Sequence, residues 1–419
     1  MNYINRSIEK EIIKLSNSFP AIVITGPRQV GKTTMLRFLS DNMDKKLNYV
    51  SLDNLKDRAL AIQDPELFLE MYQSPLIIGE FQYAPNLLSY IKIEIDNKRV
   101  DSLKNNNNSN GMYFLTSSQS FLSMKEVTES LAGRIGIVNL YGLSSREINK
   151  EPNNLFIPEV SSLKKEKILV NIPYKELWKR IFFGSFPEIY KNKNIELEKF
   201  YDGYVKTYIE RDIRDLINVK DEIKFMKFMI SVAARTGQEL NLNEICNDAE
   251  ISNPTANEWL SILVNTGLVF LLEPYSTNII KRIVKRPKLY FMDTGLACYL
   301  AKYPSSEILE SSAFSGHIFE TYVISEIIKS YTNNGLDPKR YLSYYRDNNK
   351  KEIDLIIEYN NILYPIEIKK NKNPNKECIK NFDVLKDFNK EVGNGIVLCN
   401  IDTIYPIDKN NWYVPIKYI

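Results

Sequence analysis

A glycine-bounded loop near the start of the chain has the residue types and spacing needed to hold phosphate groups. It has the pattern G-x-x-x-x-G-K-[ST], follows the apolar run 21–24, and precedes an apolar spacing over 35–39 that is typical of a helix. In this order, glycines let backbone N–H groups surround a phosphate, and the helix N-terminus adds further donors. Lys32 would reach the β- and γ-phosphates, and the Thr33 hydroxyl would take one Mg²⁺ coordination position. The residues expected to bind ATP in this loop are Gly26, Pro27, Arg28, Gln29, Val30, Gly31, Lys32, Thr33 and Thr34.

The residues after a later apolar run bear on whether a bound nucleotide could be hydrolysed. Enzymes with such a loop normally place an Asp, often followed by Glu, after a buried strand, to hold Mg²⁺ and polarise water. Here the apolar run 76–78 is followed by Gly79 and Glu80. Glu80 is the candidate for orienting the attacking water, whereas Gly79 supplies no carboxylate. We therefore expect ATP binding to survive better than hydrolysis.

Two further positions are candidates for acting on the γ-phosphate. The apolar run 112–116 ends in a polar stretch that includes Ser118, which is well placed to sense that phosphate. Arg134 follows this stretch and is a candidate finger that completes the site of a neighbouring subunit in a homo-oligomer. The alternative for Arg134 is a surface salt bridge.

The C-terminal region holds a second pattern that could do chemistry. Asp354, followed by Glu367-Ile-Lys369, fits the D…(D/E)-x-K core of metal-dependent nucleases. Asn360-Asn361 between them suits a two-residue hairpin turn with positive φ. Closing the hairpin there places Asp354 opposite Glu367, about 5 Å apart between Cβ atoms, where two carboxylates repel unless a cation joins them.

The other groups of this second site follow from its chemistry. Glu320, on a preceding helix, is the candidate third metal ligand beside Asp354 and Glu367. Lys369 would stabilise a pentacovalent phosphate or orient the attacking water. The alternative is an edge hairpin that holds both of its carboxylates out in solvent.

The apolar patterns divide the chain into regions that would position these residues. Strands alternate with helices over 1–150, which predicts a parallel sheet with helices on both faces. Residues 151–220 are expected to form a mainly helical linker, and residues 221–290 follow the order of a winged helix-turn-helix. A last α/β unit is expected over 300–419, with a helix around 319–329 and strands at 341–346, 352–359 and 362–369.

The helix-turn-helix bears on whether DNA is a partner. Its second helix exposes no Lys or Arg, although a helix in the major groove usually carries at least one. Contact with phosphates would therefore depend on a basic cluster beside the wing, and DNA binding and a purely structural role both stay open. The cluster consists of Lys281, Arg282, Lys285, Arg286 and Lys288.

Composition excludes several other classes of function. The 419-residue chain has a net charge of +3, so a nucleic-acid surface would have to be local. Four widely spaced cysteines favour reduced thiols in a cytoplasm, and a single histidine excludes a two-histidine metal site within one chain. No apolar run approaches the ~18 residues needed to cross a bilayer, so we expect a cytoplasmic protein without a membrane partner.

These motifs, in this order, resemble the archaeal-type AAA+ ATPases that carry a conserved C-terminal domain of unknown function. The resemblance covers nearly the whole chain and implies an AAA+ module, a winged helix and a C-terminal restriction-endonuclease-like α/β domain of the PD-(D/E)XK type. That family usually has Asp-Glu where this chain has Gly79-Glu80, and a glycine where it has Ser117. The matching stretches are Gly26–Thr34, Leu76–Pro85, Leu115–Gln119, Ser130–Arg134, Gly184–Pro187, Asp293–Leu296 and the hairpin from Asp354 to Lys369.

The sequence thus predicts an ATP-binding AAA+ protein, an ATPase, whose nucleotide state drives or gates a DNA-directed C-terminal module. One alternative is a nucleotide-switched regulator that binds DNA or protein without catalysis, as Gly79 would permit. Another is a scaffold whose winged helix and nuclease-like fold bind only protein partners.

Overall fold

The N-terminal region folds around a five-stranded parallel sheet in the order β2-β3-β4-β1-β5. The computed structural model describes residues 3–41, 46–105, 108–117, 127, 129–208, 222–276 and 286–419. Because the strands are parallel, the loops that follow β1, β3 and β4 meet at one edge of the sheet. The strands are β1 (Ala21–Thr25), β2 (Asn48–Ser51), β3 (Leu76–Gly79), β4 (Tyr113–Thr116) and β5 (Ile135–Asn139).

Helices cover both faces of this sheet, as the alternating pattern predicted. Ile22 and Ile24 of β1 pack with one set of helices, α1 and α2, while Val23 faces the opposite set, which includes α4 and α5. The expected strands β1 to β4 are confirmed, whereas β5 was not predicted. The helices are α1 (Glu9–Ser16), α2 (Lys32–Asp41), α3 (Leu55–Gln63), α4 (Pro65–Met71) and α5 (Leu87–Asn105).

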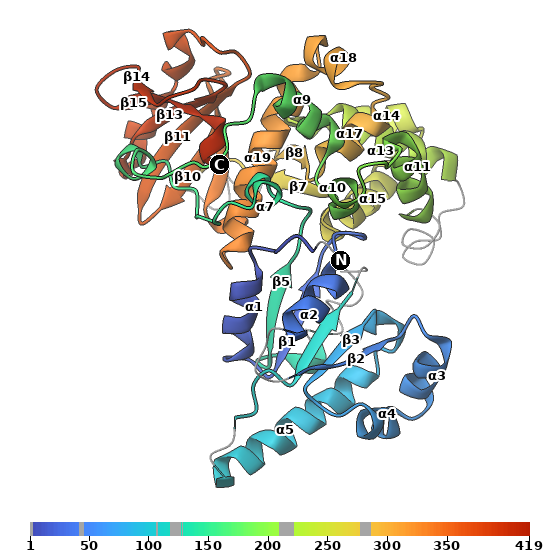
Figure 1. Ribbon diagram of the computed structural model, residues 1–419. Coiled ribbons are helices and arrows are strands. Elements are labelled where there is room, and N and C mark those ends of the chain that lie inside the picture. Colours follow the sequence, from blue (N-terminus) through green and yellow to red (C-terminus); the bar gives the residue numbers. More distant parts are fainter. Residues whose placement is uncertain are drawn as a thin grey trace.

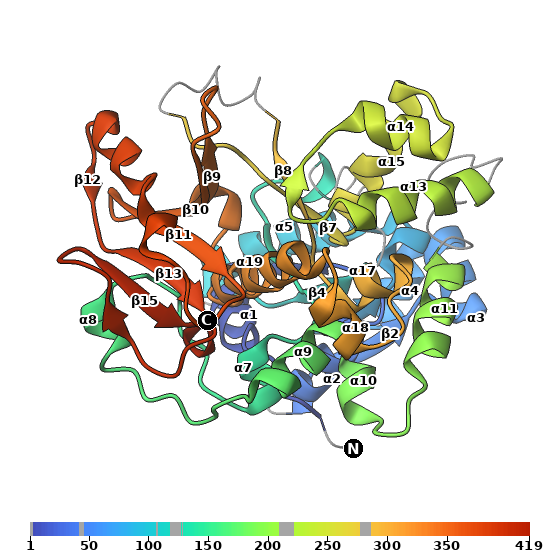
Figure 2. The same ribbon diagram turned by 90° about the horizontal axis from the view of Figure 1, so that it is seen from above.

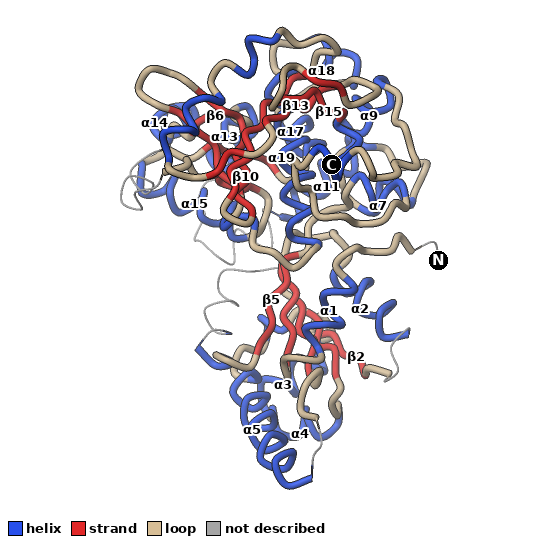
Figure 3. The backbone as a smooth tube through the Cα atoms, turned by 90° about the vertical axis from the view of Figure 1, so that its left-hand side faces the viewer, coloured by secondary structure: helices blue, strands red, loops and turns tan. Residues whose placement is uncertain are grey.

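A second lobe stands above the sheet and holds most of the described residues that follow β5 (Figures 1 and 3). The expectation of a mainly helical linker is correct from Tyr174 to Tyr208, but residues 150–173 are irregular apart from α8, and residues 209–221 lie outside the described part. The helices are α7 (Ser145–Asn149), α8 (Val160–Leu163), α9 (Tyr174–Phe183), α10 (Pro187–Lys191) and α11 (Leu197–Tyr208).

The next unit pairs three helices with a small antiparallel sheet in the order β6-β8-β7. The two expected helices and the strand after them are confirmed, and Ser252 caps the second helix by accepting a hydrogen bond from the Thr255 amide. The elements are α13 (Glu222–Ala234), β6 (Gln238–Glu239), α14 (Leu242–Ala249), α15 (Asn253–Asn265), β7 (Val269–Leu272) and β8 (Lys288–Phe291).

The C-terminal unit is a mixed sheet in the order β14-β15-β13-β11-β10-β9, with β12 beside β11. The predicted strands β9, β10 and β11 form an antiparallel meander, and β13 and β15, which were not predicted, extend it in parallel. Its elements are β9 (Leu342–Arg346), β10 (Glu352–Tyr359), β11 (Ile362–Lys369), β12 (Glu391–Val392), β13 (Gly395–Cys399), β14 (Tyr405–Pro406) and β15 (Asn411–Pro415).

A long helix, α19 (Ser315–Asn333), lies between this sheet and the helical unit (Figure 2). Two shorter helices precede it, α17 (Thr294–Leu300) and α18 (Ser306–Ser311). The apolar core is continuous from β1 through α19 to β11, because Ile24, Ile327 and Ile366 belong to the same buried cluster. No helix in the described part of the chain is long and apolar enough to span a membrane.

Two stretches that carry the resemblance to the AAA+ family meet in this second lobe. Asp293 caps α17 by accepting from the Leu296 amide, and it also accepts hydrogen bonds from the amide and hydroxyl of Ser185. Gly184 adopts φ +76°, and a Cβ there would lie 2.5 Å from an Asp293 carboxylate oxygen. The glycine is therefore required by the close approach of these two stretches.

The hairpin register follows the sequence-based expectation. Leu355 pairs with Ile366 and Tyr359 with Ile362, so Asp354 and Glu367 lie opposite each other one position further. Asn360 and Asn361 have φ values of 50° and 64°, as a two-residue turn with positive φ requires. The alternative of a solvent-exposed edge hairpin is wrong, because β10 and β11 are interior strands and both carboxylates are buried.

Candidate nucleotide and carboxylate sites

The glycine loop between β1 and α2 has a backbone shaped to surround an anion. Gly26, Gln29 and Gly31 have φ values of 132°, 61° and 89°. A Cβ at Gly26 would lie 2.1 Å from the Leu140 carbonyl oxygen, so no larger residue fits there. The loop leads directly into the N-terminus of α2, whose amides point toward it. This geometry fits a phosphate ligand.

Lys32 contributes an ammonium group to this loop. It is buried, with 6% of its surface exposed, and its Nζ donates hydrogen bonds of 2.8 Å to the carbonyl oxygens of both Gly26 and Pro27. Its ammonium is therefore held against the loop backbone, and Thr33 follows at the start of α2. Binding of phosphate by Lys32 and of Mg²⁺ by Thr33 stays a prediction from the sequence.

Arg6, which the sequence analysis missed, holds the back of the loop. Its guanidinium donates to the carbonyl oxygens of Val30 and Tyr141 at 2.9 and 2.7 Å. It also forms an ion pair of 3.2 Å with Glu147, and the two side chains are 3% and 1% exposed. No local pattern marks Arg6, since its partners are distant in the chain.

The ends of β3 and β4 lie beside the loop. Thr116 is paired with Ile24 of β1 and with Gly79 of β3, and its buried Oγ1 has no hydrogen-bond partner among the described residues. Glu80 has φ 54° and accepts a hydrogen bond of 2.7 Å from Gln82. The predicted γ-phosphate sensor Ser118 lies outside the described residues. The Thr116 hydroxyl and the Glu80 carboxylate at this edge suit contacts with a polar ligand and with a water molecule that would attack that ligand.

Arg134 lies at the amino-terminal end of the parallel strands, whereas the glycine loop lies at their carboxyl-terminal end. Its backbone carbonyl accepts from the amide of Ala21, the first residue of β1. Its guanidinium makes a two-point contact with Asp96 at 2.8 and 2.9 Å, which lowers the pKa of that carboxyl below its ordinary value. Arg134 is therefore remote from the loop of its own chain, and it forms the surface salt bridge that was the alternative interpretation of this residue.

The second pattern brings its residues together in the C-terminal unit. Asp354 and Glu367 are 7% and 9% exposed, and an Asp354 oxygen accepts from the Ile368 amide at 2.9 Å. Lys369 Nζ lies 2.5 Å from Glu367 and 3.6 Å from Asp354. Glu320 reaches the same cluster from α19. The predicted convergence of these four side chains is present in the structure.

Lys288 is the unexpected member of this cluster. It was expected to belong to an exposed basic patch, but it is 3% exposed, and its Nζ lies 3.1, 2.6 and 3.9 Å from Glu320, Glu352 and Asp354. Its place in a DNA-contacting cluster was therefore wrong, because β8 turns this side chain inward. Arg286 is exposed, and Lys281, Arg282 and Lys285 lie outside the described residues.

Burial and mutual repulsion perturb these carboxylates. Burial raises the pKa of Glu367, as does repulsion from Asp354, while Lys369 acts in the opposite direction. Burial also raises the pKa of Glu320, and Lys288 opposes that shift. Burial disfavours the ammonium form of Lys288, but the surrounding acidic groups, Glu320 first, raise its pKa well above its ordinary value. These carboxylates hold one buried cation, Lys288, and one partly exposed cation, Lys369.

The donor chemistry of the cluster suits a hard divalent cation. Magnesium prefers carboxylate oxygens, which Glu320, Asp354 and Glu367 supply. In the structure, however, the ammonium groups of Lys288 and Lys369 lie among those oxygens. No group of three or more His, Cys, Asp or Glu side chains within the described ranges is arranged to hold a metal ion. The cluster as described is an ion-pair network.

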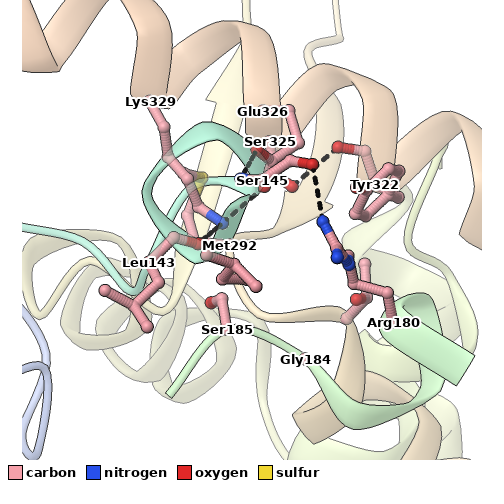
Figure 4. Close-up of a pocket in the computed structure, with 12 residues that line it drawn as sticks. Leu143, Ser145, Arg180, Gly184, Ser185, Met292, Tyr322, Ser325, Glu326 and Lys329 are labelled. Carbon is pink, nitrogen blue, oxygen red and sulfur yellow. Dashed lines mark hydrogen bonds and ion pairs between the residues drawn. The ribbon is translucent and has the colours of Figure 1, made fainter. Parts of the chain in front are cut away.

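A buried polar joint connects the region after β5 to α19 (Figure 4). Glu326 accepts a hydrogen bond of 2.6 Å from the Ser145 amide and pairs with Lys329 at 2.9 Å. Lys329 Nζ also donates to the Leu143 carbonyl oxygen at 3.1 Å. Arg180 donates to the Ser145 hydroxyl at 3.0 Å. One end of α19 is thus attached to the segment that carries Glu147, the partner of Arg6.

Comparisons with known proteins agree with the N-terminal assignment. Residues 18–149 match the family model described as the AAA domain. This part of the chain is therefore similar to AAA domains. Residues 174–307 and 315–419 match two domains of unknown function, DUF8612 and DUF4143.

Relatives are known from several organisms. An uncharacterized protein of Mycobacterium tuberculosis is 26% identical over 355 residues, which cover 85% of this chain and 71% of that protein. An uncharacterized protein of Methanocaldococcus jannaschii is 27% identical over 308 residues, covering 69% and 63%. Among solved structures, the Walker-type ATPase of Pyrococcus abyssi is 15% identical, covers 70% of this chain and 94% of that one, and has a TM-score of 0.43. The RuvB Holliday junction branch migration motor of Thermotoga maritima is 17% identical, covers 63% and 88%, and has a TM-score of 0.30.

Replacing Lys32 by Ala should weaken ATP binding by at least about tenfold, because a hydrogen bond to a charged group contributes about 1.5–3 kcal/mol. Isothermal titration with ATP and Mg²⁺ measures this. Arg37→Ala removes an exposed cation from the same helix and should leave the affinity unchanged. Equal ATP affinity of the Lys32 variant and the unmodified protein would contradict the assignment of the loop.

Replacing Gly79 by Asp should raise Mg²⁺-dependent ATP turnover by about tenfold, which corresponds to about 1.4 kcal/mol of the barrier. A Cβ at Gly79 would meet Ser51 Oγ at 3.3 Å, so the side chain can be accommodated with a small shift. Steady-state phosphate release measures the change, and Gly79→Asn controls for size without charge. If Asp and Asn behave alike, a missing carboxylate is not what limits turnover.

Proposed function

We propose that this protein is an AAA+ ATPase whose nucleotide state is transmitted to a DNA-directed C-terminal unit. The observation that carries the proposal is the position of α19, which carries a member of the carboxylate cluster and is hydrogen-bonded to the segment after β5. That segment also carries Glu147, the partner of Arg6 behind the glycine loop. Toward its C-terminal half, Glu326 and Lys329 hold the segment after β5. Toward its N-terminal half, Glu320 belongs to the carboxylate cluster. These positions are about 9 Å apart along the helix axis.

Each residue of the nucleotide site has a defined role in this proposal. Lys32 and the loop amides bind the β- and γ-phosphates, and Thr33 helps to hold Mg²⁺. Glu80 orients the attacking water, while Thr116 contacts the γ-phosphate or that water. When bound, Mg²⁺ neutralises charge that develops on the phosphates. Arg6 donates a hydrogen bond to the Val30 carbonyl oxygen of the loop and forms an ion pair with Glu147. A movement of the loop would therefore also displace Glu147.

The connection from the loop to α19 is short and made of buried contacts. Glu147 accepts from Arg6 and from the amide of Ser144. The next residue, Ser145, donates its amide to Glu326. A shift of the loop on nucleotide exchange would therefore move α19, because packed interiors transmit displacements as rigid bodies.

DNA is the proposed partner of the upper lobe. The order of α13, β6, α14, α15, β7 and β8 supports assignment as a winged helix, a unit that commonly places its last helix in the major groove. Its basic contacts would come from Arg286 and from Lys281, Arg282 and Lys285. Lys288 is excluded from this role by its burial.

Phosphodiester cleavage is a second candidate function, favoured by the convergence of Asp354, Glu367, Lys369 and Glu320. In the family that the chain resembles, this pattern belongs to nuclease-like domains. A divalent cation held by the carboxylates would activate water, and Lys369 would stabilise charge on the phosphate. In this candidate function, the contacts through α19 would transmit the nucleotide state to a cleavage site.

Removing the buried ion pair by the double substitution Glu326→Gln and Lys329→Met should uncouple the nucleotide site from the DNA-directed unit. Replacing both charges avoids leaving one unpaired. We expect ATP affinity to stay within about threefold, while the change in DNA affinity caused by ATP, typically about 5- to 150-fold for coupled sites, is largely lost. Fluorescence anisotropy with a labelled duplex, with and without ATP, measures this.

The matched control for this experiment is an equivalent pair on α9. Glu176 and Lys179 are also three residues apart but about half exposed, and Glu176→Gln with Lys179→Met should keep the ATP effect. A double variant at 326 and 329 that retains the full ATP effect, while the protein remains folded, would contradict transmission through α19.

Replacing Arg134 by Ala should lower ATP turnover by at least about tenfold without changing ATP affinity, because the guanidinium would serve the loop of a neighbouring subunit. Mixing this variant with Lys32→Ala should restore part of the activity, since mixed oligomers would contain one complete site. Arg99→Ala, on α5 near the same edge, is the control. Absence of restored activity in mixtures that do form oligomers would exclude a finger acting in trans.

A further inference from the structure

Lys288 occupies the interior of the carboxylate cluster although it comes from a different unit of the fold. It is the first residue of β8, in the three-stranded sheet, whereas its partners lie on α19 and β10. Its Nζ is 2.6 Å from Glu352, 3.1 Å from Glu320 and 3.9 Å from Asp354. The side chain is 3% exposed.

The surroundings of Lys288 hold its ammonium in one place. Its Nζ lies 5.6 Å from the ring centroid of Tyr344, a cation–π contact. Tyr290, two residues along β8 on the same side, donates to the same Glu320 oxygen at 2.7 Å. Glu352 is itself held by Arg346 at 3.1 Å. The ammonium therefore has a built site with three carboxylates and an aromatic wall.

The oxygens that Lys288 contacts are also those that a divalent cation would need. Glu320 and Asp354 are two of the three carboxylates in the second candidate function, and both face the ammonium. A cation bound between them would lie within a few ångströms of the ammonium, where like charges repel strongly in a buried environment. Both cannot occupy the cluster in the arrangement described.

We propose that Lys288 is the internal cation of the carboxylate site and competes with a divalent cation for Glu320 and Asp354. The inference rests on the proposed carboxylate site, and it adds a regulation of that site by the small sheet. Loading the site requires β8 to withdraw Lys288 from α19 and β10. The unit that contains the winged helix thereby controls whether the C-terminal site accepts a metal.

The test is Mn²⁺ binding to the nucleotide-free full chain, measured by the electron paramagnetic resonance signal of free Mn²⁺. Lys288→Met should bind Mn²⁺ at least tenfold more tightly than the unmodified protein. Lys390→Met is the matched control, because it removes an ammonium from Glu358, further along the same strand β10, and it should not change the affinity. A Lys288 variant that binds Mn²⁺ no more tightly than the unmodified protein overturns the proposal.

A second measurement uses the unmodified protein, so that it does not depend on the folding of the variant. Acetic anhydride labelling, mapped by mass spectrometry, should modify Lys288 several-fold faster at saturating Mn²⁺ than without it. Lys329, buried in the other ion pair of α19, serves as the reference and should not change. Unchanged labelling of Lys288 at saturating Mn²⁺ overturns the proposal.

Failure of the Lys288 proposal and failure of the proposed functions give different results. If neither the unmodified protein nor the Lys288 variant binds Mn²⁺, the competition and the cleavage candidate both fall. ATP binding by the same preparation, measured by titration, would leave the ATPase proposal standing in that case. If Mn²⁺ binds equally to all three proteins, only the role of Lys288 is rejected.

Discussion

The packing of α19 depends on the neutralisation of charges inside the protein. The helix is buried along most of its length, yet it carries Glu326 and Lys329, whose side chains are 4% and 3% exposed. Such a pair is tolerated only when its remaining hydrogen-bonding capacity is satisfied. The Ser145 amide and the Leu143 carbonyl oxygen supply those contacts from the segment after β5. The position of α19, and with it Glu320, is therefore tied to the N-terminal unit that contains the five-stranded sheet.

The glycine loop shows the same dependence on buried charge at a smaller scale. The backbone of the loop can form locally, because Gly26 and Gly31 tolerate the φ values that it needs. Its place relative to the rest of the protein is set by Arg6, which links Val30, Tyr141 and Glu147. Loss of one partner would leave the other charge buried and unpaired, which is strongly unfavourable. The loop and α19 are thus held by neighbouring residues of one segment.

The carboxylate cluster combines groups that would repel one another without their cations. Asp354 and Glu367 face each other across the hairpin, and Glu320 approaches from α19. Lys369 lies on the hairpin itself, so part of the compensation is local. Lys288 is supplied by the small sheet, so the rest depends on the relative placement of two units. This division makes the cluster sensitive to movement between them.

Local patterns in the sequence determined much of this protein. Turn chemistry at Asn360-Asn361 and the alternation around it predicted the hairpin register, since both depend on near neighbours in the chain. The same holds for the glycine loop and the strands β1 to β4. The strands β5, β13 and β15 were missed, and their places beside β1, β11 and β13 are set by pairing between residues distant in the chain.

Only the tertiary structure decided the roles of Arg6 and Lys288. In the sequence, Lys288 belongs to a run of basic residues that is equally compatible with an exposed DNA-binding surface. Its burial depends on where Glu320, Glu352 and Asp354 come to lie, and these residues belong to later parts of the chain. Arg6 likewise acquires its role from Glu147. A side chain's periodicity reports which face of its own element it occupies, whereas its charge partners are set by which elements pack together.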